Sequence, residues 1–194
     1  MSVNTEIVTP ALRACGAIPG NRVPSGPEAS AALTLYNNMV AGMRGSLIGQ
    51  PVVAKPITAS LTGIPGRMYV YGGGTQITLT LPTNIKAGAR IGAAAVGAGN
   101  VSVSPGVFLV QGASSTSVAS GERVWMFDGR GDWIRETTAA LTDEVIFDAE
   151  VREALADVLS LKLAREYGLS VSDEMRGLAE AGVTRIKRHY NGVG

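Results

Sequence analysis

The sequence has very few of the residues that most directly mark chemistry. Among its 194 residues it has one cysteine, Cys15, and one histidine, His189. A single cysteine excludes an internal disulfide, and one Cys with one His excludes a zinc site of the usual four-ligand kind. Cys15 falls on an apolar stripe, so we expect a core residue. His189 falls near the end of a predicted helix, where we expect it to cap the helix dipole or face solvent.

Strong charge and long apolar runs are also missing. The formal net charge is +1, and aromatic residues make up 5% of the chain. A near-neutral balance does not indicate nucleic acid as a partner. No apolar run reaches membrane-spanning length, and the N-terminus lacks a basic segment followed by an apolar core. We therefore expect a folded, soluble protein, made in a reducing compartment, with no membrane partner.

Motifs for catalysis and cofactor binding are missing as well. There is no phosphate-binding loop, and Gly72-Gly-Gly74 lacks the strand-to-helix setting of dinucleotide sites, so it is interpreted as a turn. No Gly-x-Ser-x-Gly elbow occurs, and Asp143 and Glu144 fit better as charges at a helix N-terminus. Arg130-Gly-Asp132 is interpreted as turn chemistry rather than an adhesion signal. The prediction is a protein that is not an enzyme and has no cofactor.

What is present begins with two amphipathic helices between Asp143 and Asn191. In the first, apolar residues recur three and four positions apart, and Gly168 follows the last of them as a stop. Ser170 and Ser172 offer cap oxygens for the second helix. Neither helix is stable alone in water, so both need a partner surface. The residues predicted to pack in the core or between subunits are Leu155, Val158, Leu159, Leu163, Leu178 and Ile186.

The first third of the chain has the same helical character. Thr5 to Gly16 predicts a short helix, with Pro10 in its first turn or at a kink. Three prolines and three glycines between Gly16 and Pro27 predict a loop. Ser25 and Glu28 have the spacing of a capping box, so a longer helix is expected from there to about Gly45.

Between Gln50 and Thr137 the pattern changes to short β-branched runs separated by glycines. Ile77, Leu79 and Leu81 alternate with polar neighbours, which indicates a strand with one buried face. The glycine-rich stretch from Phe127 to Trp133 predicts a hairpin. Seven candidate strands at this spacing favour a small barrel or sandwich. They are Met68–Tyr71, Thr75–Leu81, Ala89–Val96, Asn100–Ser104, Val107–Val110, Arg123–Phe127 and Asp132–Glu136.

The predicted fold class is therefore α+β, with helices, then strands, then helices. Because neither helical arm buries its stripe alone, we expect the two arms to pack as one helical bundle. The strands then form an all-β domain inserted between the arms. The predicted boundaries are 1–55 for the N-terminal arm, 56–136 for the β-domain and 137–194 for the C-terminal arm.

Two groups of side chains are candidate binding residues. Basic residues gather on the last helix and could contact DNA or a protein partner, although Glu174 and Glu180 on the same helix also fit a solvated face. Aromatic residues of the strand region could form a platform for carbohydrate, although a small barrel more often buries them. The basic group is Arg176, Arg185, Lys187 and Arg188, and the aromatic group is Tyr69, Tyr71, Trp125 and Trp133.

Both helical arms resemble the head-tail adaptor proteins of tailed bacteriophages, also called head completion or packaged-DNA stabilisation proteins, particularly those of short-tailed phages. The resemblance covers just over half the chain as a pattern of helix lengths and small residues in the correct order. The chain departs from the family in two ways. Its strand-rich insertion is much larger, and it stops soon after the last helix, where some relatives carry a longer tail that docks on the portal. The segments that carry it are 11–18, 24–30, 31–39, 153–168 and 185–191.

The resemblance implies a structural virion protein that forms an oligomeric ring, twelvefold in that family, between portal and tail. Such a ring seals packaged DNA in the head and carries the tail. The implied partners are the portal protein, a tail nozzle or tail tube protein or a tail fibre, and double-stranded DNA without sequence preference. The implied location is the head-tail interface of the virion, after synthesis in the bacterial cytoplasm. The alternative is a carbohydrate- or receptor-binding module of a virion that acts through the β-domain.

Overall fold

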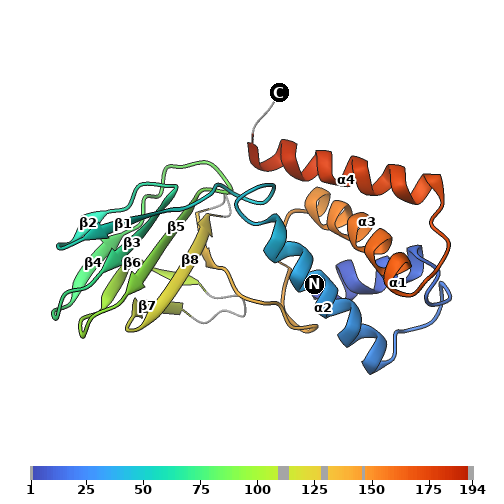
Figure 1. Ribbon diagram of the computed structural model, residues 1–194, viewed down its shortest axis with the longest axis horizontal. Helices are drawn as coiled ribbons and strands as arrows, with labels where there is room; N and C mark the ends of the chain where they lie inside the picture. Colours follow the sequence, from blue (N-terminus) through green and yellow to red (C-terminus); the bar gives the residue numbers. More distant parts are fainter. Residues whose placement is uncertain (1, 109–113, 128–130, 146, 192–194) are drawn as a thin grey trace. The chain divides into compact units, whose positions relative to one another are not determined.

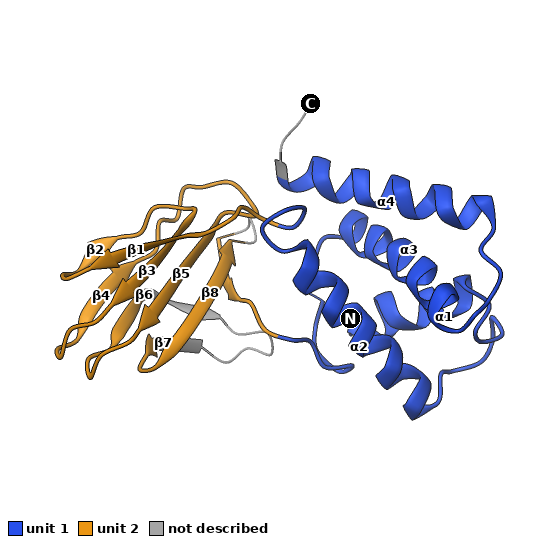
Figure 2. Ribbon diagram, viewed as in Figure 1, with its two compact units in different colours: residues 1–48, 138–194 blue, residues 49–137 orange. Residues whose placement is uncertain are grey.

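The computed structural model describes residues 2–108, 114–127, 131–145 and 147–191, with side chains omitted at 105–116 and 191. The fold is α+β, as predicted. The chain divides into two compact units (Figure 2). Unit 1 comprises Met1–Ile48 and Thr138–Gly194, and unit 2 comprises Gly49–Thr137. The first boundary lies before residue 55 because Gln50 donates its backbone N–H to Gly88 and a strand already begins at Val53.

Unit 1 is helical, and its helices lie where the apolar periodicity predicts them (Figure 1). Pro10 stands in the first turn of its helix, the position where its missing N–H costs least. Gly168 ends the third helix in a left-handed conformation with φ 63°. The elements are the π-helical turn η1 (Asn4–Val8), α1 (Thr9–Ala14), α2 (Gly26–Met43), α3 (Ala149–Glu166) and α4 (Asp173–Asn191).

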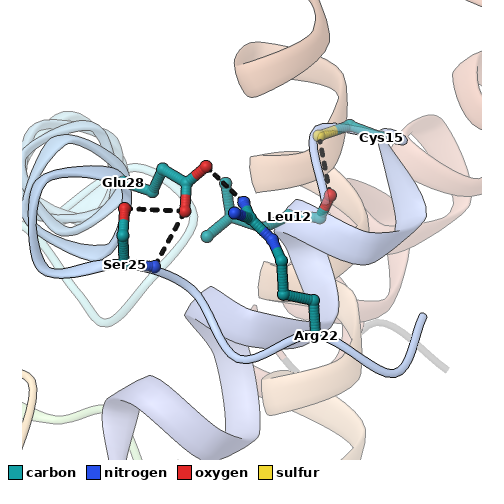
Figure 3. A network of polar contacts seen from close by, with 5 residues as sticks. All are labelled: Leu12, Cys15, Arg22, Ser25 and Glu28. Atoms are coloured by element: carbon teal, nitrogen blue, oxygen red, sulfur yellow. Dashed lines mark hydrogen bonds and ion pairs between the residues drawn. The ribbon is translucent and has the colours of Figure 1, made fainter. Parts of the chain in front are cut away.

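The predicted capping box starts α2. Glu28 accepts two hydrogen bonds from Ser25, one from the backbone N–H at 2.8 Å and one from the hydroxyl at 2.8 Å (Figure 3). Arg22, from the preceding loop, pairs with the other oxygen of Glu28. Cys15 is buried as expected, and its thiol donates to the carbonyl of Leu12 at 3.3 Å. Burial raises the pKa of this thiol.

The segment that returns from unit 2 is tied into the helical unit by hydrogen bonds from the side chain of Asn37 and from the backbone of the N-terminal residues. The amide of Asn37 on α2 bonds Ala139 twice, donating to its carbonyl at 2.9 Å and accepting from its N–H at 2.8 Å. Val3 donates to the carbonyl of Asp143 at 2.9 Å, and Asn4 donates to that of Leu141 at 3.1 Å. The N-terminus, α2 and the return segment therefore belong to one packed body.

Unit 2 is a nine-stranded sheet with the order β1-β3-β5-β8-β9-β6-β4-β2, and β7 pairs with β6. The hairpin prediction is confirmed, because β8 and β9 pair antiparallel with Phe127 opposite Trp133; residues 128–130 of its turn lie outside the described residues. Three strands were not predicted: β1, β2 and β7. Two predicted strands, Asn100–Ser104 and Val107–Val110, are instead one strand, β6, with a register shift, and residues 109 and 110 are not described. The strands are Val53–Ile57, Leu61–Thr62, Arg67–Tyr71, Ile77–Thr80, Arg90–Ala95, Val101–Phe108, Ser114–Val118, Gly121–Phe127 and Trp133–Arg135, for β1 to β9.

The first six strands alternate between two parallel series, because β1 pairs with β3 and β3 with β5, while β2 pairs with β4 and β4 with β6. Arg67 on β3 pairs with Ile91 on β5, and Ile77 on β4 pairs with Val101 on β6, so these two strand pairs share a register offset of 24 residues. The intervening turns stack backbone on backbone: a Cβ on Gly97 would lie 2.5 Å from the carbonyl oxygen of Gly72. Glycine is therefore required there, and Gly72–Gly74 is a turn, as predicted.

One buried arginine holds the two ends of unit 2 together. Arg90 on β5 binds the carboxylate of Glu136 through Nε at 2.5 Å and Nη2 at 2.7 Å. Its Nη1 donates to the carbonyl of Gln50 at 3.0 Å. Gln50 follows the first residue of the unit and Glu136 precedes the last, so a single guanidinium fixes both chain crossings.

Candidate functional site

The predicted packing and basic residues lie on α3 and α4, two helices that pack closely in unit 1. Gly182 makes the approach possible, because a Cβ there would lie 2.9 Å from the carbonyl oxygen of Ala154. Ala154, Ala179 and Ile186 are buried at this contact. Small residues on both helices therefore let the two backbones come together.

Five of the six predicted packing residues are buried, and one is not. The buried five are Leu155, Val158, Leu159, Leu163 and Ile186. Leu178 on α4 is 48% exposed, so it contributes little to packing within the chain. Its helical spacing places it beside the core stripe, at the edge of the face that α4 turns to α3. A large apolar side chain is thus presented on the surface of α4.

The predicted basic cluster separates into residues with different environments. Arg185 lies against α3, where it binds Asp157 at 2.5 Å and approaches Glu153 at 3.7 Å. Burial raises the pKa of Asp157, while Arg185 opposes that shift. Arg185 is therefore engaged within unit 1 rather than free for a ligand.

The other three basic residues are exposed on α4. Arg176 approaches Asp173 at 3.8 Å, an exposed pair of little energetic weight. Lys187 and Arg188 make no ion pair with any residue in the described part of the chain. They lie in the last turns of α4, where the helix dipole favours positive charge. The positive surface of α4 is thus smaller than the sequence predicts.

His189 lies between the two helices rather than in open solvent. Its Nε2 is 3.6 Å from a carboxylate oxygen of Asp148, the N-cap residue of α3, and its ring meets Tyr190 edge-on at a centroid distance of 4.8 Å. Burial, the main cause, raises the pKa of Tyr190 above its usual range. His189 therefore links the end of α4 to the start of α3, so its contacts have a structural role.

The four aromatic residues proposed as a carbohydrate platform lie in the core of unit 2. Tyr69 accepts a hydrogen bond from the N–H of Ile64 at 2.7 Å, and Trp133 donates to the carbonyl of Pro82 at 2.9 Å. Trp133 also packs against Phe127 with ring centroids 5.6 Å apart. These rings form no exposed platform, because Tyr69, Tyr71, Trp125 and Trp133 are all buried.

Within the described residues there is no group of three or more His, Cys, Asp or Glu side chains placed to hold a metal ion. No helix in that part of the chain is long and apolar enough to cross a membrane. The ion pair between Arg90 and Glu136 was not predicted, since nothing in the sequence links a residue on β5 to one that follows β9. The chain matches no protein-family model, and no curated protein matches it.

Proposed function

We propose that this chain is a non-enzymatic virion protein of a tailed bacteriophage, the adaptor that forms a ring between portal and tail. In this proposal unit 1 is the helical bundle of the ring body, and unit 2 is an inserted β-domain. The ring of about twelve copies seals packaged DNA and carries the tail, with the portal and a tail nozzle or tail tube protein as its neighbours.

The main support is that both segments of the resemblance contribute to one helical core. Leu12 and Tyr36 from the N-terminal arm and Leu159 from the C-terminal arm are all buried in unit 1. Two sequence segments separated by a 49–137 insertion therefore depend on each other for burial. A ring body needs such a self-contained bundle, because the insertion must be free to meet a different neighbour.

The exposed side of α4 is the surface that we propose for contacts with a neighbouring copy or the portal. Leu178 is an exposed apolar residue, and a Cβ added at Gly177 would meet no atom within 4 Å, so the helix surface is open there. Lys187 and Arg188 lie two to three turns further along, with Lys187 on the opposite side of the helix from Leu178, and suit sequence-independent contact with DNA phosphates rather than the contact at Leu178. Arg176 is a weaker contributor, and Arg185 has no such role because it is paired with α3.

The alternative function, a carbohydrate- or receptor-binding module, has no support from the residues proposed for binding. Its aromatic platform requires exposed rings, and the four candidate rings are buried. These four aromatic residues are core residues of unit 2. We therefore do not propose glycan binding through these side chains.

The proposed surface is tested by Leu178→Glu. We expect the variant to remain folded, because Leu178 is half exposed, but to lose most of its assembly on portal protein from the same source. The matched control is Val23→Glu, another exposed apolar position of unit 1, which should assemble normally. Size-exclusion chromatography with light scattering measures the complex. Normal assembly of Leu178→Glu would remove α4 from the proposed interface.

A further inference from the structure

Two arginines on the core-facing side of unit 2 stand beside a buried tryptophan. Trp125 on β8 lies directly opposite Arg135 on β9, and Arg123 is two residues before Trp125 on β8. Residues in these positions share one face of the sheet. That face is the core side, because Trp125 and Ala93, which pairs with Arg123 on β5, are both fully buried.

These side chains have unsatisfied hydrogen-bonding groups. Nε1 of Trp125 and Nε of Arg135 are buried and have no hydrogen-bond partner. Arg123 donates from Nη1 to the carbonyl of Glu122 at 2.8 Å. In the part of the chain that the structure describes, no carboxylate forms an ion pair with Arg123 or Arg135. Burial first, and the nearby Arg123 second, lower the pKa of Arg135.

The chemistry of these groups indicates which kind of ligand would satisfy them. Guanidinium and indole N–H groups only donate, so they cannot satisfy one another. Buried donors in folded proteins are normally paired, so a buried donor with no partner in the chain can take an acceptor from outside it. Two neighbouring cations with no carboxylate favour an anion over a neutral acceptor. A guanidinium fork matches the oxygens of phosphate, sulfate or carboxylate.

We propose that Arg123, Arg135 and Trp125 form a binding site for a small oxyanion of the phosphate or sulfate class. The ligand must be small, because Trp125 has no exposed surface and both arginines are only partly exposed. The two guanidinium groups supply charge and hydrogen bonds, and the indole N–H supplies a neutral donor. This inference concerns unit 2 alone and does not rest on the adaptor function.

The full chain carries its own reporter for this test. Both of its tryptophans, Trp125 and Trp133, lie in unit 2, so tryptophan fluorescence follows the unfolding of that unit. The protein is heated in chloride buffer and in phosphate or sulfate buffer of equal ionic strength. Saturating phosphate or sulfate should raise the fluorescence midpoint by roughly 5 °C, since a ligand that binds only the folded state stabilises it.

Variants assign the effect to the site. Arg135→Met should abolish the phosphate shift and should be at least as stable as the parent chain in chloride, because it removes an unpaired, partly buried cation. Lys55→Met removes one exposed charge from the same unit and should keep the shift. If Arg135→Met does not fold, Arg123→Met provides the second test and should weaken phosphate binding at least tenfold.

Three results would overturn the proposal. The first is an equal midpoint in phosphate, sulfate and chloride. The second is a full phosphate shift in Arg135→Met or Arg123→Met. The third is a shift with acetate but with neither phosphate nor sulfate, which would point instead to a carboxylate from another molecule.

Discussion

Single polar side chains fix the start of a helix and the segment that returns from unit 2. Glu28 joins the start of α2 to its own N-cap and to Arg22, and Asn37 replaces a backbone partner for Ala139. The Glu28 contact was predictable, because the capping box is local in sequence. The Asn37 and Arg185 contacts were not, because helical spacing says nothing about which residue of another segment lies opposite.

Glu28 should make part of the stability of unit 1 depend on pH. Hydrogen bonds from Ser25, with help from Arg22, lower the pKa of Glu28 from 4.5 to about 2. A lowered carboxyl pKa gives stability that is fully present above pH 4.5 and is lost as the pH falls through about 2. Glu28→Gln should therefore lower the urea midpoint at pH 7, and its difference from the parent chain should shrink between these two pH values.

The matched control for that measurement is Glu180→Gln, an exposed carboxylate on α4 whose side chain makes no hydrogen bond or ion pair within the described residues. Circular dichroism at 222 nm follows the helices in both variants. If the deficit of Glu28→Gln is the same at pH 7 and at pH 2, the carboxylate contacts do not stabilise α2.

Helices were predicted more accurately than strands, for physical reasons that particular elements illustrate. The stripe of α3 repeats over several turns, so its position follows from the apolar spacing alone. Strand β1 contains Lys55 and Pro56, which are typical of loops and of sheet edges, and β7 is mostly serine. Parallel pairing at a 24-residue offset joins distant segments, so no local pattern reveals it.

The close contact of α3 and α4 predicts that Gly→Ala has opposite effects on the stability of unit 1 at Gly182 and at Gly177. Gly182→Ala places a methyl group 2.9 Å from the carbonyl oxygen of Ala154, which forces the helices apart. Gly177→Ala, on the same helix, meets no atom within 4 Å and gains helix propensity of about 1 kcal/mol. We expect Gly182→Ala to destabilise unit 1 by about 1–2 kcal/mol, after its own propensity gain, and Gly177→Ala to stabilise it.

Urea unfolding followed at 222 nm measures both variants. A gain in stability of similar size for the two alanines would show that α4 does not need the close approach at Gly182, and would contradict the packing of this helix pair.

At the scale of the whole molecule, the segments where the chain passes between the two units are bonded within each unit separately. Arg90 joins Gln50 and Glu136 within unit 2, and Asn37 secures Ala139 within unit 1. The division into two units followed from the change in composition after Gly49, but the location of the first boundary depended on strand β1, whose residues do not resemble a strand.

Because the ends are held separately, removal of residues 50–136 should leave a folded helical unit. With a short Gly-Ser linker in place of the β-unit, we expect a cooperative thermal transition at 222 nm, since the buried side chains of unit 1 all come from residues that remain. A shortened chain without helical structure would mean that unit 1 depends on unit 2 for its stability.

The most direct test of the adaptor function is the native mass of the purified full chain, alone and after mixing with portal protein from the same source. The proposal predicts a small species alone and a stoichiometric ring on the portal. A chain that stays small and does not bind the portal would contradict it.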